Sequence, residues 1–534
     1  MTEPLPENTR QGFMPLLSQS AVYALLGIFF CLFAYCAYQR VTYPFEIDWL
    51  EGELICHAVK LIKGHAIYAP PSTEFVAELY PPFYYAVSAL FFKIFATFNF
   101  LIPRLLSVFC LMGILCLLYL IQLKEGGNKS TAVISSGFFL SFYEIHGPWY
   151  DVGRVDMLFF LLVLSGLYAT AYSKNTWRGV CAGSVLLVLA CYTKQPALAF
   201  IPFAALYLYL SDKKSGIVFA LLSLGLAAGI FYILNLATDG WFATYTWVNP
   251  LRYNVIMNKP LSELPFQLMF ELRDRLLPEM RYEIFYKLPV FFTLALAFAV
   301  NRALALKRTS KLRIWEITSI PAAVSYFSIR PHLGSEKNDF IFMTLWGCML
   351  LGFLLARLAR PGFDSGKRTT VYLLLALQLS LCLYNPKNVV PSPGSAARGA
   401  EFIAMVKSIP GPVYIPFHSF YGYMAGKGMF LNGGAYWAYQ VLSKDKFRMD
   451  DMIQKLKNKY FDAIIIDEKA YVTMKGEKIA IDNVKLLLTS RDEMSQAVDE
   501  NYAPAKRVPF RNDEEFRNVT GFTTRPELIL EPKK

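Results

Sequence analysis

Long apolar runs alternate with short polar segments over the first three quarters of the chain. An α-helix needs about twenty apolar residues to cross the hydrocarbon core of a bilayer, and several runs approach this length. A further apolar segment, 83–97, follows two prolines and carries Lys93, so we interpret it as partly inserted in the membrane or lying on its surface. The pattern predicts about eleven transmembrane helices, at residues 17–38, 101–122, 130–143, 157–173, 178–192, 196–210, 215–236, 287–301, 312–329, 339–356 and 369–384.

The pattern changes near the end of the last apolar run. Residues 386–395 (PKNVVPSPGS) are rich in Pro, Gly and Ser and are typical of a linker. Beyond it the pattern predicts two buried strands with an amphipathic helix between them: 411–417, 460–467 and 449–458. We therefore expect a polytopic α-helical membrane domain over 1–386, with a first outer loop at 39–100, and a small soluble α/β domain over 387–534.

Composition agrees with a membrane protein. The 534 residues are 55% hydrophobic and only 18% charged, with a mean hydropathy of +0.34. The net charge of +12 could indicate a nucleic-acid partner, but much of it sits in short loops between apolar runs, so no nucleic acid is expected. Nine cysteines, with none after Cys382, argue against a disulfide framework.

Lysine and arginine in the short loops set the expected orientation. Short loops rich in these residues stay in the cytoplasm. The basic loops alternate along the chain with loops poorer in positive charge and lie at 124–129, 173–179, 211–216, 301–313 and 356–368. The first outer loop and the C-terminal domain then face the opposite side, the periplasm or lumen. The compact loops favour a bacterial inner membrane.

The stretch EIDWLEGE (46–53) places four carboxylates just after the first apolar run. One interpretation is structural. Asp48 and Glu51 resemble a capping box that starts a helix, and an apolar stripe that runs to a stop at Gly64 fits an amphipathic helix on the membrane surface.

The other interpretation is a reactive site. Glu78 precedes a second aromatic and proline-rich segment, YPPFYY, which begins at Tyr80. Charges at the edge of a membrane are expensive and often mark function. Cations occur at several loop edges of the same face: Arg104, Arg154, Lys194, Arg330 and Lys337. Carboxylates and cations at one face suit a reaction that needs a base and an anion holder, and the natural anion in a membrane is a lipid phosphate.

Several short motifs follow the first apolar run in a fixed order. They are the Asp48 motif, GHAIY (64–68), YPPFYY (80–85), IPR (102–104), RVD (154–156) and TKQP (193–196). Their order and expected topology resemble the GT-C superfamily of membrane glycosyltransferases. The chain is most similar to the branch of bacterial protein mannosyltransferases and the lipid A aminoarabinose transferase, over about residues 17–210.

The resemblance implies transfer of a sugar from a polyprenyl-phosphate donor to a lipid, polysaccharide or protein acceptor outside the cytoplasm, with inversion at the anomeric carbon. It implies that Asp48 is the base on the acceptor hydroxyl. Trp49 follows Asp48 where many members have Glu, so Glu51 and Glu78 are the remaining acids expected to position the acceptor or tune Asp48. Lys194 is expected near the donor phosphate, paired with Asp156.

Each candidate has a structural alternative. Arg154 and Asp156 could form an ion pair between helices, and Lys194 could reach the membrane interface as a flexible lysine. The segment IRPHLGSEKND (329–339) could bind the phosphate or the sugar through Arg330, His332 and Lys337, or form a polar turn.

The sequence requires no cofactor. No histidine spacing predicts a metal triad, although carboxylates could hold a divalent cation, and no nucleotide-binding motif is present. Two other functions remain open, a transporter or flippase of lipid-linked sugars and an inactive scaffold. A transporter should show mid-span charges and an internal repeat, and neither is visible in the sequence.

Overall fold

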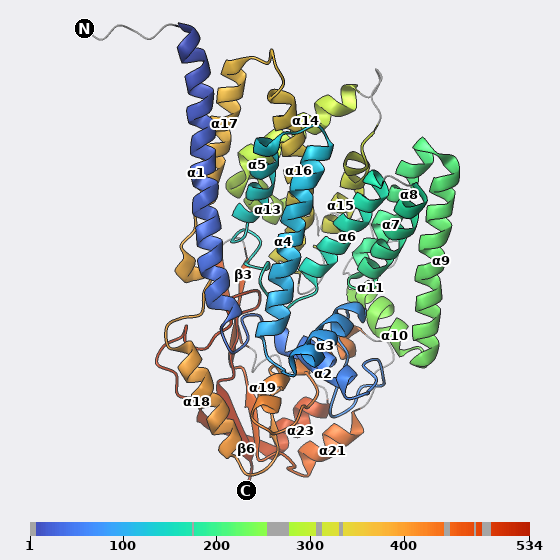
Figure 1. Ribbon diagram of the computed structural model, residues 1–534. Helices are drawn as coiled ribbons and strands as arrows, with labels where there is room; N and C mark the ends of the chain where they lie inside the picture. Colours follow the sequence, from blue (N-terminus) through green and yellow to red (C-terminus); the bar gives the residue numbers. More distant parts are fainter. Residues whose placement is uncertain are drawn as a thin grey trace, which may run out of the picture.

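The computed structural model forms an elongated helical body with a smaller domain at one end (Figure 1). The structure describes residues 7–173, 176–253, 277–305, 312–330, 335–442, 449–474, 477–482 and 493–534. The C-terminus lies in the smaller domain, and the N-terminal end of the first helix lies at the far end of the body (Figure 1).

Each of the eleven predicted spans falls on a helix. The helices are α1 (Glu7–Val41), α4 (Leu101–Lys124), α5 (Lys129–Ser141), α6 (Asp156–Tyr172), α7 (Thr176–Cys191), α8 (Phe200–Ser211), α9 (Lys213–Ala237), α14 (Pro289–Ala305), α15 (Ile314–Ile329), α16 (Ile341–Leu358) and α17 (Ser365–Leu381). Their apolar composition and the likeness reported below confirm a helical membrane protein.

The number of membrane crossings stays a prediction. Within the described ranges, four helical stretches are long and apolar enough to cross a membrane: Met14–Val41, Leu101–Lys124, Lys213–Ala237 and Lys337–Leu358. A bent pair, Arg281–Lys287 and Pro289–Leu304, would make a fifth. Several of the other helices are apolar but shorter, as the short runs in the sequence suggest.

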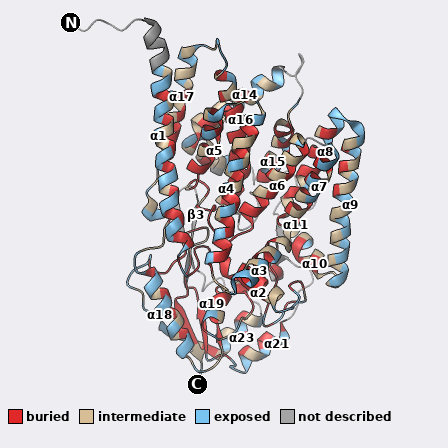
Figure 2. Ribbon diagram, in the orientation of Figure 1, coloured by how far each residue is buried: buried red, intermediate tan, exposed pale blue. Residues whose placement is uncertain are grey.

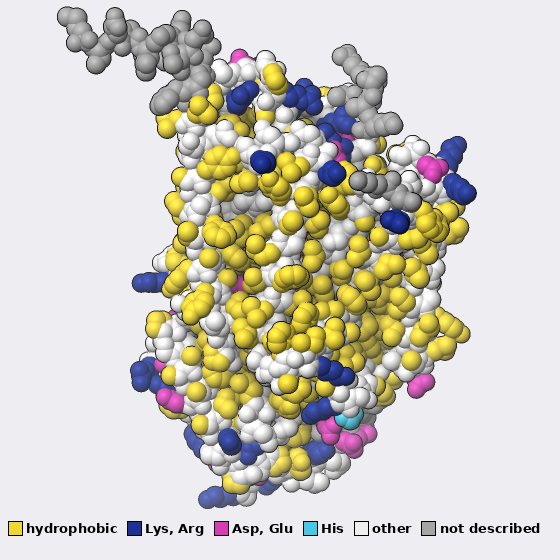
Figure 3. Space-filling view, in the orientation of Figure 1, with side chains coloured by type: hydrophobic (Ala, Val, Ile, Leu, Met, Phe, Trp, Pro, Cys, Tyr) yellow, Lys and Arg dark blue, Asp and Glu magenta, His cyan; other side chains and the backbone are white. Residues whose placement is uncertain are grey.

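The outer faces of the bundle are apolar. On α9 the side chains of Leu221, Tyr232, Ile233 and Leu236 are all exposed. Figure 2 shows the outer face of α9 in the exposed colour, and Figure 3 shows hydrophobic side chains across the middle of the molecule. Such a surface suits lipid rather than water, since a soluble monomer rarely exposes a large contiguous apolar patch.

The first outer loop contains two helices, α2 (Glu51–Ile62) and α3 (Phe83–Phe95). Helix α2 ends as predicted, at Lys63 followed by Gly64 in the left-handed region. It does not lie on the membrane surface, however, because every residue from Glu51 to Val59 is buried. Helix α19 (Ser419–Met424) of the C-terminal domain packs against α2, so this apolar stripe is covered by protein rather than by lipid.

A second outer region joins α9 to α14. Its described parts are largely helical: α10 (Trp241–Ala243), η2 (Thr244–Val248), α11 (Asn249–Tyr253), α13 (Leu277–Met280) and η4 (Arg281–Lys287). These short helices lie at the two ends of the segment between α9 and α14.

The C-terminal domain is a small α/β unit, as predicted. Strands β1 (Val413–Tyr414) and β2 (Ala463–Ile466) lie in the two predicted strand segments, and α21 (Asp450–Lys457) lies in the predicted helix. The main sheet has the order β1-β2-β6-β5, in which β1 and β2 are parallel. The remaining elements are α18 (Ser395–Ser408), α20 (Gly433–Leu442), β3 (Lys469–Met474), β4 (Glu477–Asp482), α23 (Glu493–Asn501), β5 (Tyr502–Arg507) and β6 (Leu528–Pro532). The boundary between residues 386 and 387 stays a prediction.

Candidate active site

A cavity of about 680 Å³ lies between the helical body and the C-terminal domain. Its charged and amide side chains come from the first outer loop, the segment before α6, the turn after α7 and the segment that leads into the short helix η6 (Lys337–Phe340). Apolar residues from α15, from the turn before α8 and from α11 form the rest of the wall. Lining side chains include Trp49, Glu78, Tyr80, Trp149, Arg154, Lys194, Gln195, Trp247, Ile329, Glu336, Asn338 and Asp339.

Two cations line this cavity, and each is paired with a buried aspartate. Arg154 Nη1 lies 2.7 Å from Asp48 Oδ2, and Arg154 Nη2 donates to the Tyr80 hydroxyl at 2.9 Å. Lys194 Nζ lies 2.8 Å from Asp156 Oδ1, the pairing that the resemblance implies. We call Arg154–Asp48 and Lys194–Asp156 the cavity pairs. Between them they bring together four of the residues selected from the sequence.

Lys194 is also held by a second acid that the sequence analysis did not select. Asp339 Oδ1 lies 4.0 Å from Lys194 Nζ, and Asn338 donates to Asp156 Oδ1 at 3.0 Å. Burial disfavours a charged lysine, but Asp156 and Asp339 outweigh it and raise the pKa of Lys194 above its ordinary value. Lys194 therefore stays charged and can act as a point charge for an anion.

Asp48 contacts Arg154 and is fully buried. Its Oδ2 accepts from Arg154 and from the Leu50 backbone N–H, whereas its Oδ1 has no hydrogen-bond partner among the residues that the structure describes. Burial raises the pKa of Asp48 to about 6, although the nearby Arg154 opposes this shift. A carboxylate with a free oxygen and a pKa close to neutrality is suited to accept a proton.

Glu78 faces the cavity from an extended segment whose backbone groups bond to side chains. His57 Nε2 accepts from the Glu78 backbone N–H at 3.0 Å, Gln195 donates to the Leu79 carbonyl at 2.7 Å, and Tyr68 donates to the Tyr80 carbonyl at 2.7 Å. Three side chains from separate segments thus hold residues 78–80, which present the Glu78 carboxylate and the Tyr80 hydroxyl.

The protonation of His57 and Glu78 follows from burial. His57 stacks on Tyr85 and is fully buried, which lowers the pKa of its imidazole to about 3. It is therefore neutral, with the proton on Nδ1, which faces the Glu53 carbonyl at 2.8 Å. Burial raises the pKa of Glu78 to about 7 against the opposing charge of Arg154. The sequence analysis did not select His57 and so missed its contact with the Glu78 backbone.

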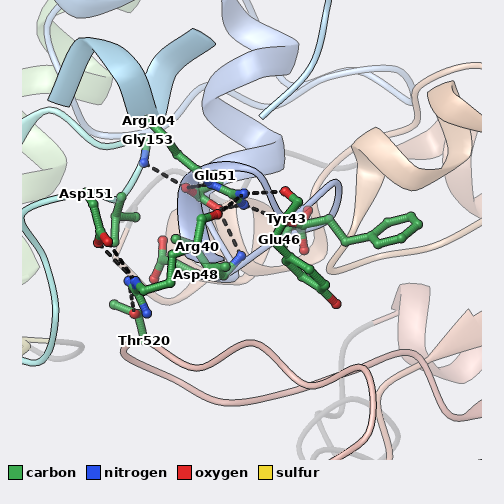
Figure 4. A network of polar contacts seen from close by, with 12 residues as sticks. Arg40, Tyr43, Glu46, Asp48, Glu51, Arg104, Asp151, Gly153 and Thr520 are labelled. Carbon is green, nitrogen blue, oxygen red and sulfur yellow. Dashed lines mark hydrogen bonds and ion pairs between the residues drawn. The ribbon is translucent and has the colours of Figure 1, made fainter. Parts of the chain in front are cut away.

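Glu51 and Arg104 do not line the cavity but form an ion pair beside it (Figure 4). Glu51 accepts two hydrogen bonds from Arg104 and two from the backbone N–H groups of Ile47 and Gly153. Burial alone would raise the pKa of Glu51, but Arg104 and the backbone donors outweigh it and lower that pKa. With its oxygens occupied, Glu51 stabilises the loop and leaves no oxygen free for an acceptor.

Arg104 was expected to hold the donor phosphate. Besides Glu51, its guanidinium donates to the backbone carbonyls of Arg40, Tyr43 and Phe45. Every guanidinium nitrogen is engaged, so the structure makes Arg104 a support for the loop that carries Asp48.

The capping-box interpretation of Asp48 and Glu51 is wrong. The residue that precedes helix α2 is Leu50, and no side chain caps this end of the helix. Asp48 instead accepts from Leu50, two residues further on, and Glu51 reaches back to Ile47. Both side chains are used in tertiary contacts, which a local capping pattern does not reveal.

The predicted segment 329–339 reaches the cavity mainly through residues other than those selected. Arg330 pairs with Glu283 at 3.4 Å and donates to the Glu336 carbonyl at 3.0 Å, and neither Arg330 nor Lys337 lines the cavity. His332 lies outside the described residues.

Glu336 does line the cavity, and burial together with the like charge of Asp48 raises its pKa to about 7. The signal for Glu336, Asn338 and Asp339 was present in the run SEKND (335–339), where we selected only Lys337. Among the described residues, no group of three or more His, Cys, Asp or Glu side chains is arranged to hold a metal ion.

No protein-family model and no curated protein sequence matches the chain. Solved structures do resemble it. ArnT from Cupriavidus metallidurans in the apo state has a TM-score of 0.52 at 11% identity, with 96% of this chain and 98% of that chain covered. ArnT bound to undecaprenyl phosphate has a TM-score of 0.48 at 11% identity, with 95% and 97% covered.

An oligosaccharyltransferase from Archaeoglobus fulgidus, tethered to an acceptor peptide, has a TM-score of 0.48 at 11% identity. That match covers 86% of this chain and 74% of the oligosaccharyltransferase. ArnT is a GT-C protein, and its apo structure confirms the predicted resemblance to the GT-C superfamily as a likeness in fold.

Proposed function

We propose that this protein is a membrane glycosyltransferase that moves a sugar from a polyprenyl-phosphate donor to an acceptor outside the cytoplasm. The observation that carries the proposal is the cavity, in which two cations, Arg154 and Lys194, stand beside an apolar wall and buried carboxylates. A polyprenyl-phosphate sugar has the three matching parts: an apolar chain, a phosphate and a polyhydroxylated ring. The GT-C fold supports the same function.

In the proposed reaction, the acceptor hydroxyl oxygen attacks the anomeric carbon while the bond from that carbon to the phosphate oxygen breaks. The electron pair of the broken bond leaves with the polyprenyl phosphate, and attack from the opposite side inverts the anomeric carbon. The hydroxyl proton passes to Asp48, whose Oδ1 is free to accept it. A positioned base of this kind contributes roughly 10²- to 10⁴-fold to the rate.

The cations have the complementary task. Lys194 and Arg154 stabilise the negative charge that develops on the leaving phosphate, Lys194 as a point charge and Arg154 through its planar guanidinium. Glu78 and Glu336 have pKa values raised to about 7, so close to neutral pH each is often protonated and repels the phosphate less. In that form each can also hydrogen-bond a sugar hydroxyl.

The test measures release of polyprenyl phosphate from a panel of undecaprenyl-phosphate pentoses, hexoses and amino sugars, with a bacterial envelope extract as the acceptor source. We expect wild-type protein to consume at least one donor and Asp48→Asn to lose roughly 10²-fold or more of that rate. Asp364→Asn is the matched control, because Asp364 is an exposed cap of α17. Unchanged turnover in Asp48→Asn would remove Asp48 as the base, and a panel with no consumed donor would contradict the proposed function.

A further inference from the structure

The segment Val519–Phe522 of the C-terminal domain lies against the loop that carries Asp48. The backbone N–H groups of Val519 and Thr520 both donate to the Ile47 carbonyl, at 3.1 and 2.9 Å. The rings of Phe522 and Trp49 lie edge to face, with centroids 6.3 Å apart. Two segments more than 450 residues apart in the sequence, by the numbering of these contacts, are therefore joined at the candidate base.

Buried side chains fix this segment on both sides. Before Gly521, the Thr520 hydroxyl accepts from the buried Arg40 at 2.8 Å (Figure 4). After it, the Thr524 hydroxyl donates to Asp467, which also contacts His418 Nε2 at 3.0 Å. His418 in turn contacts Glu46 of the first outer loop through its other ring nitrogen. The segment therefore has one position relative to the Asp48 loop.

Gly521 directly follows Thr520, which forms an isolated β-bridge with Asp48. A methyl group added at this position would lie 3.1 Å from Asp48 Oδ1 and 3.3 Å from the Trp149 ring. Gly521 has φ +63°, a conformation that side chains other than glycine rarely adopt. Asp48 Oδ1 is the oxygen that has no hydrogen-bond partner among the described residues. The missing side chain thus lets the backbone of this segment pack against that oxygen.

A side-chain carbon at position 521, only 3.1 Å from Oδ1, would be closer than side-chain carbons normally lie to their neighbours, so it would push against Asp48. We propose that the segment Val519–Phe522 positions Asp48 for proton transfer and that glycine is required at 521 because a side chain there would displace the Asp48 carboxylate. This rests on the proposed function, and it makes the C-terminal domain part of the transferase site.

The decisive comparison is Gly521→Ala with Gly426→Ala. Both glycines belong to the C-terminal domain and have positive φ values, +63° and +72°, so alanine strains the backbone in a similar way. A methyl group at 426 meets nothing within 4 Å, whereas one at 521 meets Asp48 and Trp149. The two variants therefore differ in the contact at the base and share the backbone strain.

For Gly521→Ala we expect the transfer rate to fall about 10- to 100-fold, since a displacement of about 1 Å at a reacting group costs that much. Its Kd for undecaprenyl phosphate should stay within about twofold of wild type, because the cations are untouched. Gly426→Ala should keep both values close to wild type. Unfolding midpoints of the two variants in detergent check that they share the same strain.

Equal transfer rates in the two glycine variants would overturn the proposal. If Gly521→Ala does not fold, Thr520→Val tests the proposal instead. This substitution removes the hydroxyl that Arg40 contacts and keeps the volume of the side chain. It should lower transfer several-fold with unchanged binding of undecaprenyl phosphate, and a wild-type rate would overturn the proposal. Failure of the proposed function looks different, because the wild-type protein would then consume no donor or Asp48→Asn would stay active.

Discussion

Buried arginine and lysine side chains around the first outer loop pair with carboxylates in two different ways. Arg40–Asp151 and Arg104–Glu51 lie outside the cavity, and we call them the frame pairs (Figure 4). In the frame pairs, both carboxylates accept hydrogen bonds at each oxygen. In the cavity pairs, Asp48 Oδ1, Asp156 Oδ2 and Arg154 Nε have no hydrogen-bond partner within the described part of the chain.

This difference separates the ion pairs that support the fold from those that can take part in the reaction. A buried polar atom without a partner costs free energy, so a folded protein keeps such atoms mainly where something else uses them. The frame pairs are complete without a ligand and fix the loop that carries Asp48. The cavity pairs are incomplete, and they border the space in which a donor and an acceptor would meet. Substitutions in the two groups should therefore affect different quantities.

The largest effect is expected in a frame pair. Arg104→Met leaves Glu51 buried without its counter-charge, which should lower the free energy of unfolding by about 3–5 kcal/mol. Thermal unfolding of the purified protein in detergent measures this loss. Arg507→Met is the control, because Arg507 is 68% exposed in its pair with Glu468 and an exposed pair contributes about 0–1 kcal/mol. An equal midpoint in both variants would show that Arg104 does not support the fold.

A cavity pair should behave in the opposite way. Lys194→Met removes the point charge proposed for the leaving phosphate, so turnover should fall roughly 10²- to 10³-fold. Its unfolding midpoint should fall less than that of Arg104→Met, because Asn338 still donates to Asp156 and the site borders a cavity. Lys387→Met, an exposed lysine at η7 (Pro386–Asn388), is the control for turnover. If Lys194→Met lowered the unfolding midpoint as much as Arg104→Met does and kept the wild-type turnover, the two groups of ion pairs would not differ in role.

The smallest effect concerns pH. The pKa of Asp48 is raised to about 6, and the base must be deprotonated, so kcat/KM should fall as the pH drops through about 6. The pKa of Glu51 is lowered, so this frame acid stays charged across the same range. Glu78→Gln should leave the acidic limb of the profile near pH 6. If the fall of kcat/KM near pH 6 disappears in Glu78→Gln, the titrating base is Glu78 and not Asp48.

Local patterns in the chain were enough to predict the helices and much of the C-terminal domain. Each predicted span falls on a helix, and β1, β2 and α21 lie within their predicted ranges. These features depend on the spacing of apolar residues over a few turns or a few strand positions, which the sequence displays directly. The same patterns indicated an acidic loop with cations on the same face, and its motif order pointed to the GT-C fold.

The sequence did not show which charged residues support the fold and which belong to the reaction site. Glu51 and Asp48 are three residues apart, yet Glu51 is saturated by Arg104 while Asp48 keeps a free oxygen. Arg104 and Arg154 both open a predicted span in the sequence, but only Arg154 lines the cavity.

The sequence alone determined which segments form helices and strands and which segment carries the acids, because those properties depend on neighbouring residues. The tertiary structure decided which acid meets which cation, which oxygen stays free, and that Gly521 lies beside Asp48. Those properties depend on the packing of segments that are distant in the chain, and burial, which raises the pKa of Asp48, exists only once the segments have packed.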